Sequence, residues 1–180
     1  GLSAADRGKL IMACGTGKTF TSLKIAESVA GKGKRVLFLV PSLSLLSQTL
    51  TEWTQESDIS LHSFAVCSDS EVGKKRKKDE DVVQTLAHEL RYPATTEPKR
   101  LYQEITIRHD GEHMSVVFST YHSIDVISRA QHEFDLAAFD LVICDPPAFA
   151  PAKPALEAGL RAYERVARLA APLVAPGSRT

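Results

Sequence analysis

The sequence has no net charge, since 22 Lys and Arg residues balance 22 Asp and Glu residues over its 180 positions. The field of the whole chain therefore steers no ligand of either sign, and a nucleic-acid partner would have to be held by a local group of side chains. The chain also contains no apolar run long enough to span a bilayer, and its start has no signal-peptide pattern. From this we expect a soluble, cytoplasmic protein of one domain, with no membrane partner.

Cysteine is scarce as well. Cys14, Cys67 and Cys144 are widely spaced, lie in or beside apolar runs and form no CxxC pair. This spacing fits buried thiols in a reducing compartment better than a disulfide framework or a cysteine-based zinc site.

Two polar clusters allow a function but have simpler explanations. His109 and His113 have the spacing of metal ligands, but Asp110-Gly111 predicts a turn between them, and we expect no metal site there. The basic run at 74–78 could contact phosphates. Because three acidic residues follow it directly, we interpret the run as a solvated loop.

The most informative stretch is Met12-Ala13-Cys14-Gly15-Thr16-Gly17-Lys18-Thr19, between an apolar run and an amphipathic segment. A strand, a glycine turn, Lys-Thr and a helix form the arrangement that cradles phosphates, although the strict pattern has Gly where Met12 stands. Lys18 would neutralise the outer phosphates, Thr19 would ligate Mg²⁺, and the helix start adds its positive dipole end. The alternative is a chance glycine turn. The predicted nucleotide-binding residues are Cys14, Gly15, Thr16, Gly17, Lys18, Thr19 and Phe20.

Apolar runs alternate with helical patterns along the chain, which predicts an α/β domain with a mainly parallel sheet covered on both faces. The predicted strands are 9–13, 35–40, 59–66, 114–119 and 139–144, and the predicted helices are 18–30, 44–56, 122–131 and 153–171. The pattern degrades between residues 68 and 113, which we interpret as an excursion from the sheet. Trp53 is expected to be a core or edge aromatic residue.

Three polar segments follow directly after predicted strands: Pro41-Ser42, Thr120-Tyr121 and Asp145. Ligands of an open parallel sheet gather at the carboxyl ends of its strands. Short hydroxyl side chains there suit phosphate oxygens, and Asp145 could hold Mg²⁺ through water. The alternatives are ordinary helix capping for the hydroxyl residues and a structural turn for Asp145.

Residues 1–145 resemble the first motor domain of superfamily 2 helicases, and most closely the translocase modules of restriction–modification enzymes. The resemblance rests on four motifs in order: residues 7–19, residues 40–48, residues 119–123 and residues 139–145. It implies a three-layer RecA-like P-loop domain that binds ATP and Mg²⁺, with Lys18 and Asp145 as catalytic residues. It also implies contacts to the DNA backbone from Pro41, Ser42, Gln48, Thr120, Tyr121 and Ser123.

The sequence departs from this family after Asp145. The family continues with a Glu that polarises the attacking water, whereas this chain has Pro146-Pro147. Proline offers neither an acid nor a base, and losing a general base commonly costs about 10²–10⁴ in rate. The chain also lacks the second motor domain, the coupling motif and the adenine-reading glutamine of the family. We therefore expect ATP binding with impaired hydrolysis and no processive unwinding.

The tail, residues 139–180, resembles class I S-adenosylmethionine-dependent ribosomal RNA methyltransferases through Asp145-Pro146-Pro147-Ala148-Phe149. The chain can thus be divided at Asp145 into a motor domain, 1–145, and a methyltransferase-like tail, 146–180, that packs on the same sheet. A natural fusion, a misassembled gene and a deliberate chimera all remain open. No glycine-rich cofactor loop precedes Asp145, so methyl transfer by this chain is not expected. A further alternative is that joining the two segments has produced an inactive protein that binds neither ATP nor S-adenosylmethionine.

Overall fold

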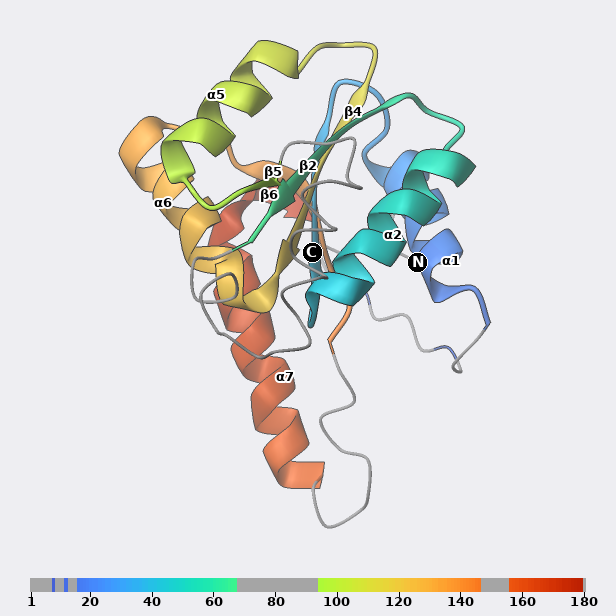
Figure 1. Ribbon diagram of the computed structural model, residues 1–180. Helices are drawn as coiled ribbons and strands as arrows, with labels where there is room; N and C mark the ends of the chain where they lie inside the picture. Colours follow the sequence, from blue (N-terminus) through green and yellow to red (C-terminus); the bar gives the residue numbers. More distant parts are fainter. Residues whose placement is uncertain (1–7, 9–11, 13–15, 68–93, 147–155, 180) are drawn as a thin grey trace, which may run out of the picture.

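Six parallel strands form one sheet in the order β3-β2-β4-β1-β5-β6 in the computed structural model (Figure 1). The structure describes residues 8, 12, 16–67, 94–146 and 156–179, with only the backbone at 156–160, 162–163 and 175–179. The strands are β1 (Arg35–Val40), β2 (Leu61–Val66), β3 (Ala94–Thr95), β4 (Met114–Thr120), β5 (Phe139–Cys144) and β6 (Val174–Arg179).

The central strands are mainly apolar because both faces of the sheet are covered. All seven residues of β4 are buried, as are five of the six in β1. These two strands pair in register from Arg35 opposite Ser115 to Val40 opposite Thr120. Valine, leucine and phenylalanine make up most of β1, and valine and phenylalanine form the middle of β4, as expected for a parallel sheet between helices.

Helices cover both faces of the sheet, so the fold has three layers (Figure 1). One face packs against α1 (Lys18–Val29) and α2 (Leu43–Glu56). The other face packs against α5 (Pro98–Arg108), α6 (Ile124–Phe134) and the end of α7 (Leu156–Ala170). Two 3₁₀ turns, η1 (Tyr121–Ser123) and η3 (Ala171–Leu173), lie before α6 and after α7. The predicted three-layer α/β class with a mainly parallel sheet is confirmed.

The core on the α1 and α2 face is built around Trp53, which is fully buried. Its ring meets Phe38 edge-on at 5.1 Å and Phe118 at 5.6 Å between centroids. Edge-to-face pairs of this kind add to the stability that burial alone gives. The prediction of Trp53 as a core aromatic residue is confirmed, and the aromatic cluster fixes α2 on the centre of the sheet.

Most predicted elements of the described region are present. The bounds of β1 and β5 are those predicted. The helices α1 and α2 each differ by one residue at one end, and α7 differs by three residues at its start and one at its end. The predicted helix at 122–131 is resolved into η1 and α6. The predicted strand at 9–13 and the basic run at 74–78 lie outside the described residues, apart from Met12.

The structure differs from the sequence interpretation at two places. The second half of the predicted excursion, 94–113, supplies β3 and α5, and α5 buries Leu101 and Ile105 in the core. The tail also supplies a strand, β6, that the sequence did not reveal. Its Pro176 and Gly177 are poor strand residues, but β6 pairs only with β5 among the described strands, and proline is tolerated at a sheet edge.

Within the described part of the chain, no helix combines the length and the apolar character needed to cross a membrane.

Candidate nucleotide and nucleic-acid site

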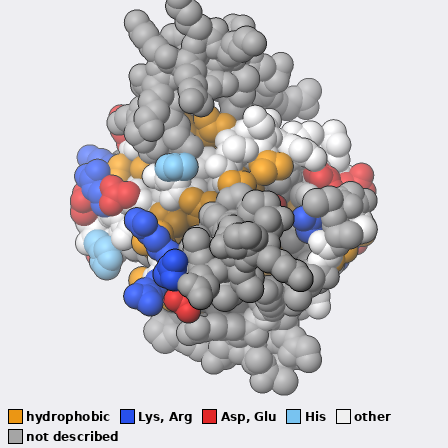
Figure 2. Space-filling view, turned by 90° about the horizontal axis from the view of Figure 1, so that it is seen from below, with side chains coloured by type: hydrophobic (Ala, Val, Ile, Leu, Met, Phe, Trp, Pro, Cys, Tyr) orange, Lys and Arg blue, Asp and Glu red, His pale blue; other side chains and the backbone are white. Residues whose placement is uncertain are grey.

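The carboxyl ends of the parallel strands lie at one edge of the sheet, at the bottom of Figure 1. The helices α1, α2 and α6 begin at this same edge (Figure 1). Figure 2 shows the edge from below: Lys and Arg side chains gather at one side, next to hydrophobic side chains. The segments that the sequence singled out after β1, β4 and β5 therefore share one edge of the molecule.

The helix α1 begins with the geometry of a phosphate loop. Gly17, its N-cap, has φ 77° and ψ 34°, in the left-handed region that favours glycine. The Gly17 carbonyl accepts the first helical hydrogen bond, from the Thr21 amide at 2.9 Å. Lys18 is the first helical residue, and both Thr16 and Lys18 are exposed. A helix start with an adjacent lysine suits an anion such as phosphate.

The structure places part of the predicted phosphate loop and not the rest. Cys14 and Gly15 lie outside the described residues, whereas Thr16 to Phe20 are described. Phe20 is 43% exposed, and the ammonium of Lys24 lies 5.3 Å from the centre of its ring.

The first turn of α1 is fixed to α2. The carbonyl oxygen of Thr19 accepts a hydrogen bond from the indole Nε1 of Trp53 at 3.1 Å and from Ser22 Oγ at 2.6 Å. Because Trp53 is fully buried, this bond joins the helix start to the rigid core. The Thr19 side chain is half-buried, and its hydroxyl oxygen is of the kind that ligates Mg²⁺.

A charged network holds the second half of α1 against the end of α2. The Glu27 carboxylate accepts hydrogen bonds from Lys24 Nζ at 2.8 Å, Ser57 Oγ at 2.8 Å and the Asp58 amide at 2.7 Å. Lys24 also contacts Asp58 at 2.8 Å. Burial raises the pKa of Glu27, but the hydrogen bonds from Lys24, Ser57 and the Asp58 amide outweigh it and lower the pKa overall. The helix that carries Lys18 is therefore anchored at both its first and its last turns.

Asp145 follows the last residue of β5 at the carboxyl edge. Its amide donates to the Leu39 carbonyl at 2.9 Å, which extends the β1–β5 ladder by one residue and fixes the Asp145 backbone. The side chain is half-buried, and Pro146 comes next. A carboxylate at the end of a rigid strand is a suitable ligand for a hard cation such as Mg²⁺.

Tyr121 and Cys144 lie side by side just behind this edge. Burial raises the pKa of the Cys144 thiol to about 11, against an opposing effect of the Tyr121 hydroxyl. Burial, with the neighbouring Cys144 and Asp145, raises the pKa of Tyr121 far above its usual value. Both groups are therefore neutral at pH 7, and neither acts as a base or a nucleophile there.

The segment after β1 presents accessible polar groups. Ser42 Oγ accepts a hydrogen bond from the Leu45 amide at 3.3 Å and caps α2. Pro41 and Ser42 are half-buried and Gln48 is exposed. The capping interpretation of Ser42 is confirmed, and a hydroxyl at a helix N-cap can also face a phosphate.

The segment after β4 is more enclosed. Thr120 and Ser123 have no exposed surface, and their hydroxyl oxygens lie 2.9 Å apart, within hydrogen-bonding distance. Tyr121, between them, is half-buried. Neither hydroxyl caps the backbone of η1 or α6 in the manner that the sequence allowed. Their contribution to this edge is to fix the turn that leads into α6.

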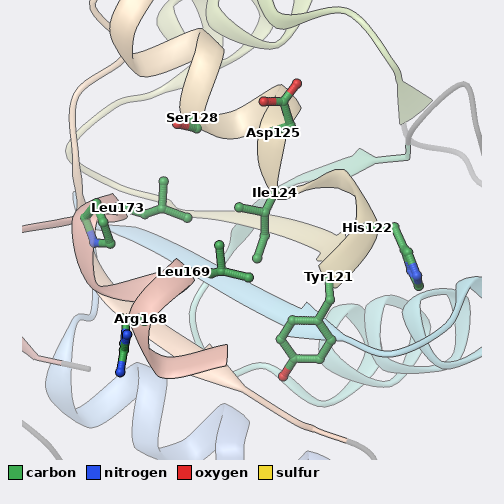
Figure 3. A pocket seen from close by; sticks show the side chains of 9 residues that line it. Tyr121, His122, Ile124, Asp125, Ser128, Arg168, Leu169 and Leu173 are labelled. Atoms are coloured by element: carbon green, nitrogen blue, oxygen red, sulfur yellow. The ribbon is translucent and has the colours of Figure 1, made fainter. Parts of the chain in front are cut away.

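A cavity of about 360 Å³ opens beside this turn, between η1, the start of α6 and the end of α7 (Figure 3). Leu169 and Leu173 face Ile124 across it, and Tyr121 and His122 lie on the η1 side. This cavity could not be predicted from the sequence, because its walls come from segments at least 40 residues apart. The lining residues are Tyr121, His122, Ile124, Asp125, Ser128, Arg168, Leu169, Pro172 and Leu173.

A parallel sheet between two helical layers, with Gly17 and Lys18 opening a helix at the carboxyl edge, is the architecture of a RecA-like P-loop domain. The particular family follows from comparison with known proteins. The model of the family "type III restriction enzyme, res subunit" matches residues 3–168, and the chain belongs to that family.

Two solved structures are similar to this chain. The first is a nuclease-deletion mutant of the Type ISP restriction–modification enzyme LlaGI in complex with a DNA substrate mimic, at 41% identity and a TM-score of 0.60. The second is the ATP-dependent Type ISP restriction–modification enzyme LlaBIII bound to DNA, at 38% identity and a TM-score of 0.58. They match 79% and 78% of this chain, which spans 13% and 9% of theirs. No curated protein sequence matched.

Proposed function

We propose that the chain is the ATP- and Mg²⁺-binding motor domain of a DNA translocase that contacts the DNA backbone and hydrolyses ATP slowly. The observation that carries this proposal is the start of α1, where left-handed Gly17 precedes exposed Lys18 at the carboxyl edge of the sheet. The relative LlaBIII is an ATP-dependent enzyme bound to DNA, which supports both ligands.

The nucleotide would lie across the start of α1. Lys18 would neutralise the β and γ phosphates, and the amides of residues 15–19 would surround them. Cys14, Thr16 and Phe20 would complete the contact surface. The Thr19 hydroxyl and the Asp145 carboxylate, both half-buried, fit a Mg²⁺ ion that binds with the nucleotide and neutralises developing charge on its phosphates.

The DNA backbone would contact the same edge. Pro41, Ser42 and Gln48 offer accessible groups, whereas Thr120 and Ser123 would position Tyr121 from below the surface. In addition, α7 exposes Arg161, Arg165 and Arg168 at a spacing that places them on one side of the helix. Such a basic row supplies phosphate affinity without reading the bases.

Pro146 would limit the hydrolytic step. It occupies the position after Asp145 where the helicase resemblance places the water-polarising Glu, and its ring cannot accept a proton. The chain could therefore bind ATP in a state that is turned over slowly. The second motor domain would have to come from another part of a longer protein or from another chain.

The test of this function is steady-state ATP hydrolysis with and without duplex DNA, in the wild-type chain and in Pro146→Glu. We expect a rate increase of roughly 10²-fold in the variant, at the lower end of what a general base contributes. The double variant Lys18→Ala/Pro146→Glu should lose the gain. If Pro146→Glu binds nucleotide normally and shows no gain, the hydrolytic part of the proposal is contradicted.

The division of the chain at Asp145 stays a proposal about ancestry. Residues 146–180 would be a tail that completes the motor domain, with α7 and β6 on the same sheet as β5. The family match continues past Asp145 to residue 168 and offers no support for a separate methyltransferase unit. We therefore do not include methyl transfer in the proposed function.

A further inference from the structure

A second cluster of chemically active side chains lies at the other end of the sheet. His62 is the second residue of β2, while Asp110 and His113 belong to the turn between α5 and β4. These positions are the amino ends of the strands, opposite the edge that carries the proposed nucleotide site (Figure 1). The pairing of β2 with β4 places His62 opposite Ser115, which brings the two histidines together.

The three side chains converge closely. Asp110 Oδ2 lies 2.8 Å from His113 Nδ1 and 3.2 Å from His62 Nε2. The two imidazole rings stack with centroids 3.9 Å apart and planes 24° apart. One potential ligand atom from each residue lies within 4.8 Å of the other two. In a tetrahedral zinc site, bonds of about 2.0–2.2 Å place the ligand atoms about 3.4 Å apart. The cluster must therefore contract, and the stacked rings must turn toward the ion, when it binds a metal.

The carboxylate is held in place for this role. Asp110 Oδ1 accepts hydrogen bonds from the amides of Glu112 at 2.9 Å and His113 at 2.8 Å. These bonds fix the carboxylate plane, and Oδ2 faces both rings. The two amide bonds leave Oδ2 as the carboxylate oxygen that faces His62 and His113.

We propose that His62, Asp110 and His113 bind one divalent transition-metal ion, of which Zn²⁺ is the reference case, with water at the remaining position. Two imidazoles and a carboxylate suit Zn²⁺ and its neighbours in the first transition row, whereas Mg²⁺ prefers oxygen ligands throughout. The ion binds apart from the nucleotide site and joins the start of β2 to the α5–β4 turn. Its role is structural, and the inference does not depend on the proposed function.

The positive charge of Arg108 weakens the binding of a cation at this site. Its Nη2 lies 3.5 Å from His62 Nδ1, and its guanidinium carbon lies 5.0 Å from the centre of the Phe64 ring. When His62 Nε2 binds a metal, Nδ1 carries the proton and then faces the guanidinium donor. Glu112, paired with Lys32 at 3.2 Å, is the other charged side chain of the turn. Removing the Arg108 charge while keeping its contact with Phe64, as in Arg108→Met, should tighten metal binding several-fold.

The neighbouring His109 provides a matched control. Its Nδ1 lies 2.9 Å from Ser115 Oγ, so it belongs to the same turn but not to the cluster. From their spacing in the sequence, His109 and His113 were considered as a pair of metal ligands, and no metal site was expected there. In the structure, His62 rather than His109 lies beside His113. The pairing of β2 with β4 brings them together, and the spacing of residues in the sequence does not reveal that pairing.

The test is calorimetric titration of the full chain with ZnCl₂, supported by the visible absorption of bound Co²⁺. We expect one ion per chain and a thermal midpoint that rises with Zn²⁺ concentration. His62→Gln and Asp110→Asn should each weaken binding at least about 10-fold, whereas His109→Gln should not. Asp110→Asn keeps an oxygen that can accept the two amide bonds, so it separates ligand loss from misfolding.

The proposal is overturned if a titration of the wild-type chain with Zn²⁺, carried above micromolar concentration, shows no binding. It is also overturned if His109→Gln weakens binding as much as His62→Gln, or if Asp110→Asn folds normally and binds with unchanged affinity. Nucleotide binding by the same preparations distinguishes this result from failure of the proposed function, because the two sites lie at opposite ends of the strands.

Discussion

The indole nitrogen of Trp53 donates a hydrogen bond of 3.1 Å to the carbonyl oxygen of Thr19. One partner is fully buried between the sheet and α2, and the other lies in the first turn of α1, next to Lys18. The bond therefore connects the hydrophobic core with the proposed phosphate site. Preorganised sites of this kind depend on a supporting shell that holds the ligand-contacting groups in place.

Replacing Trp53 by Phe removes this hydrogen bond and leaves the Thr19 carbonyl dependent on Ser22 alone. We expect the free energy of unfolding to fall by about 2–3 kcal/mol, from the lost bond and the smaller buried ring. The measurement is urea denaturation followed by circular dichroism. Nucleotide affinity should fall as well, and a variant with wild-type stability would show that the bond contributes nothing to the fold.

Glu27→Gln tests the network that anchors the end of α1. The change keeps the shape of the side chain but removes its negative charge. That charge strengthens the hydrogen bonds that Glu27 accepts from Lys24, Ser57 and the Asp58 amide. Hydrogen bonds to a charged group contribute about 1.5–3 kcal/mol, and we expect a loss within that range by urea denaturation at pH 7. Glu56→Gln is the matched control, because Glu56 is exposed at the end of α2 and should change stability little.

The same carboxylate makes stability depend on pH. The folded-state pKa of Glu27 is lowered, so its contribution is complete above the unfolded-state pKa near 4.3 and is lost as pH falls through the folded value. The stability difference between wild type and Glu27→Gln should therefore shrink as the pH falls below about 4.3. A difference that stays constant across this range would contradict the assignment.

The basic row of α7 should contribute to DNA binding. Arg165→Ala/Arg168→Ala removes two exposed positive charges of that helix. Each lost phosphate contact reduces the slope of log K against log salt by about 1. Fluorescence anisotropy with duplex DNA measures both affinity and slope. Arg129→Ala is the control, because Arg129 pairs with Glu133 on α6 at 2.8 Å, and it should leave the slope unchanged.

The thiol of Cys144 should be unreactive at neutral pH. Its pKa of about 11 means that the thiolate forms only in strongly alkaline solution. In a Cys14→Ser/Cys67→Ser background, the rate of iodoacetamide alkylation should rise with pH toward 11 and be slow at pH 8. Rapid alkylation at pH 8, in a chain that stays folded, would show that the environment of Tyr121 and Cys144 is more open than described.

The sequence predicts the centre of the fold well because the strands there are mainly apolar. The runs that form β1 and β5 have no other satisfactory location, so their bounds follow directly from composition. By contrast, α5 has only Leu101 and Ile105 on its buried side among many charged residues. Its helical pattern is weak in sequence, and contacts with the sheet and α6 stabilise it in the fold.

Some residues of the site could likewise be predicted from the sequence, and others could not. Gly17, Lys18 and Asp145 are visible in sequence because they belong to short motifs beside strands. The His62–His113 pair and the cavity beside Tyr121 are not, since strand pairing and helix packing bring together residues far apart in the chain. The burial of Thr120 and Ser123 was equally invisible, because a hydroxyl after a strand can face either the solvent or a neighbouring turn.

The most direct test of the central claim is calorimetric titration of this chain with Mg-ATPγS, and separately with S-adenosylmethionine, in wild type and Lys18→Ala. Lys32→Ala serves as the control, because Lys32 pairs with Glu112 at the opposite end of the strands. We predict saturable binding of one nucleotide to wild type and to Lys32→Ala, its loss in Lys18→Ala, and no binding of S-adenosylmethionine. Nucleotide binding that survives in Lys18→Ala, or S-adenosylmethionine binding without nucleotide binding, would contradict the account.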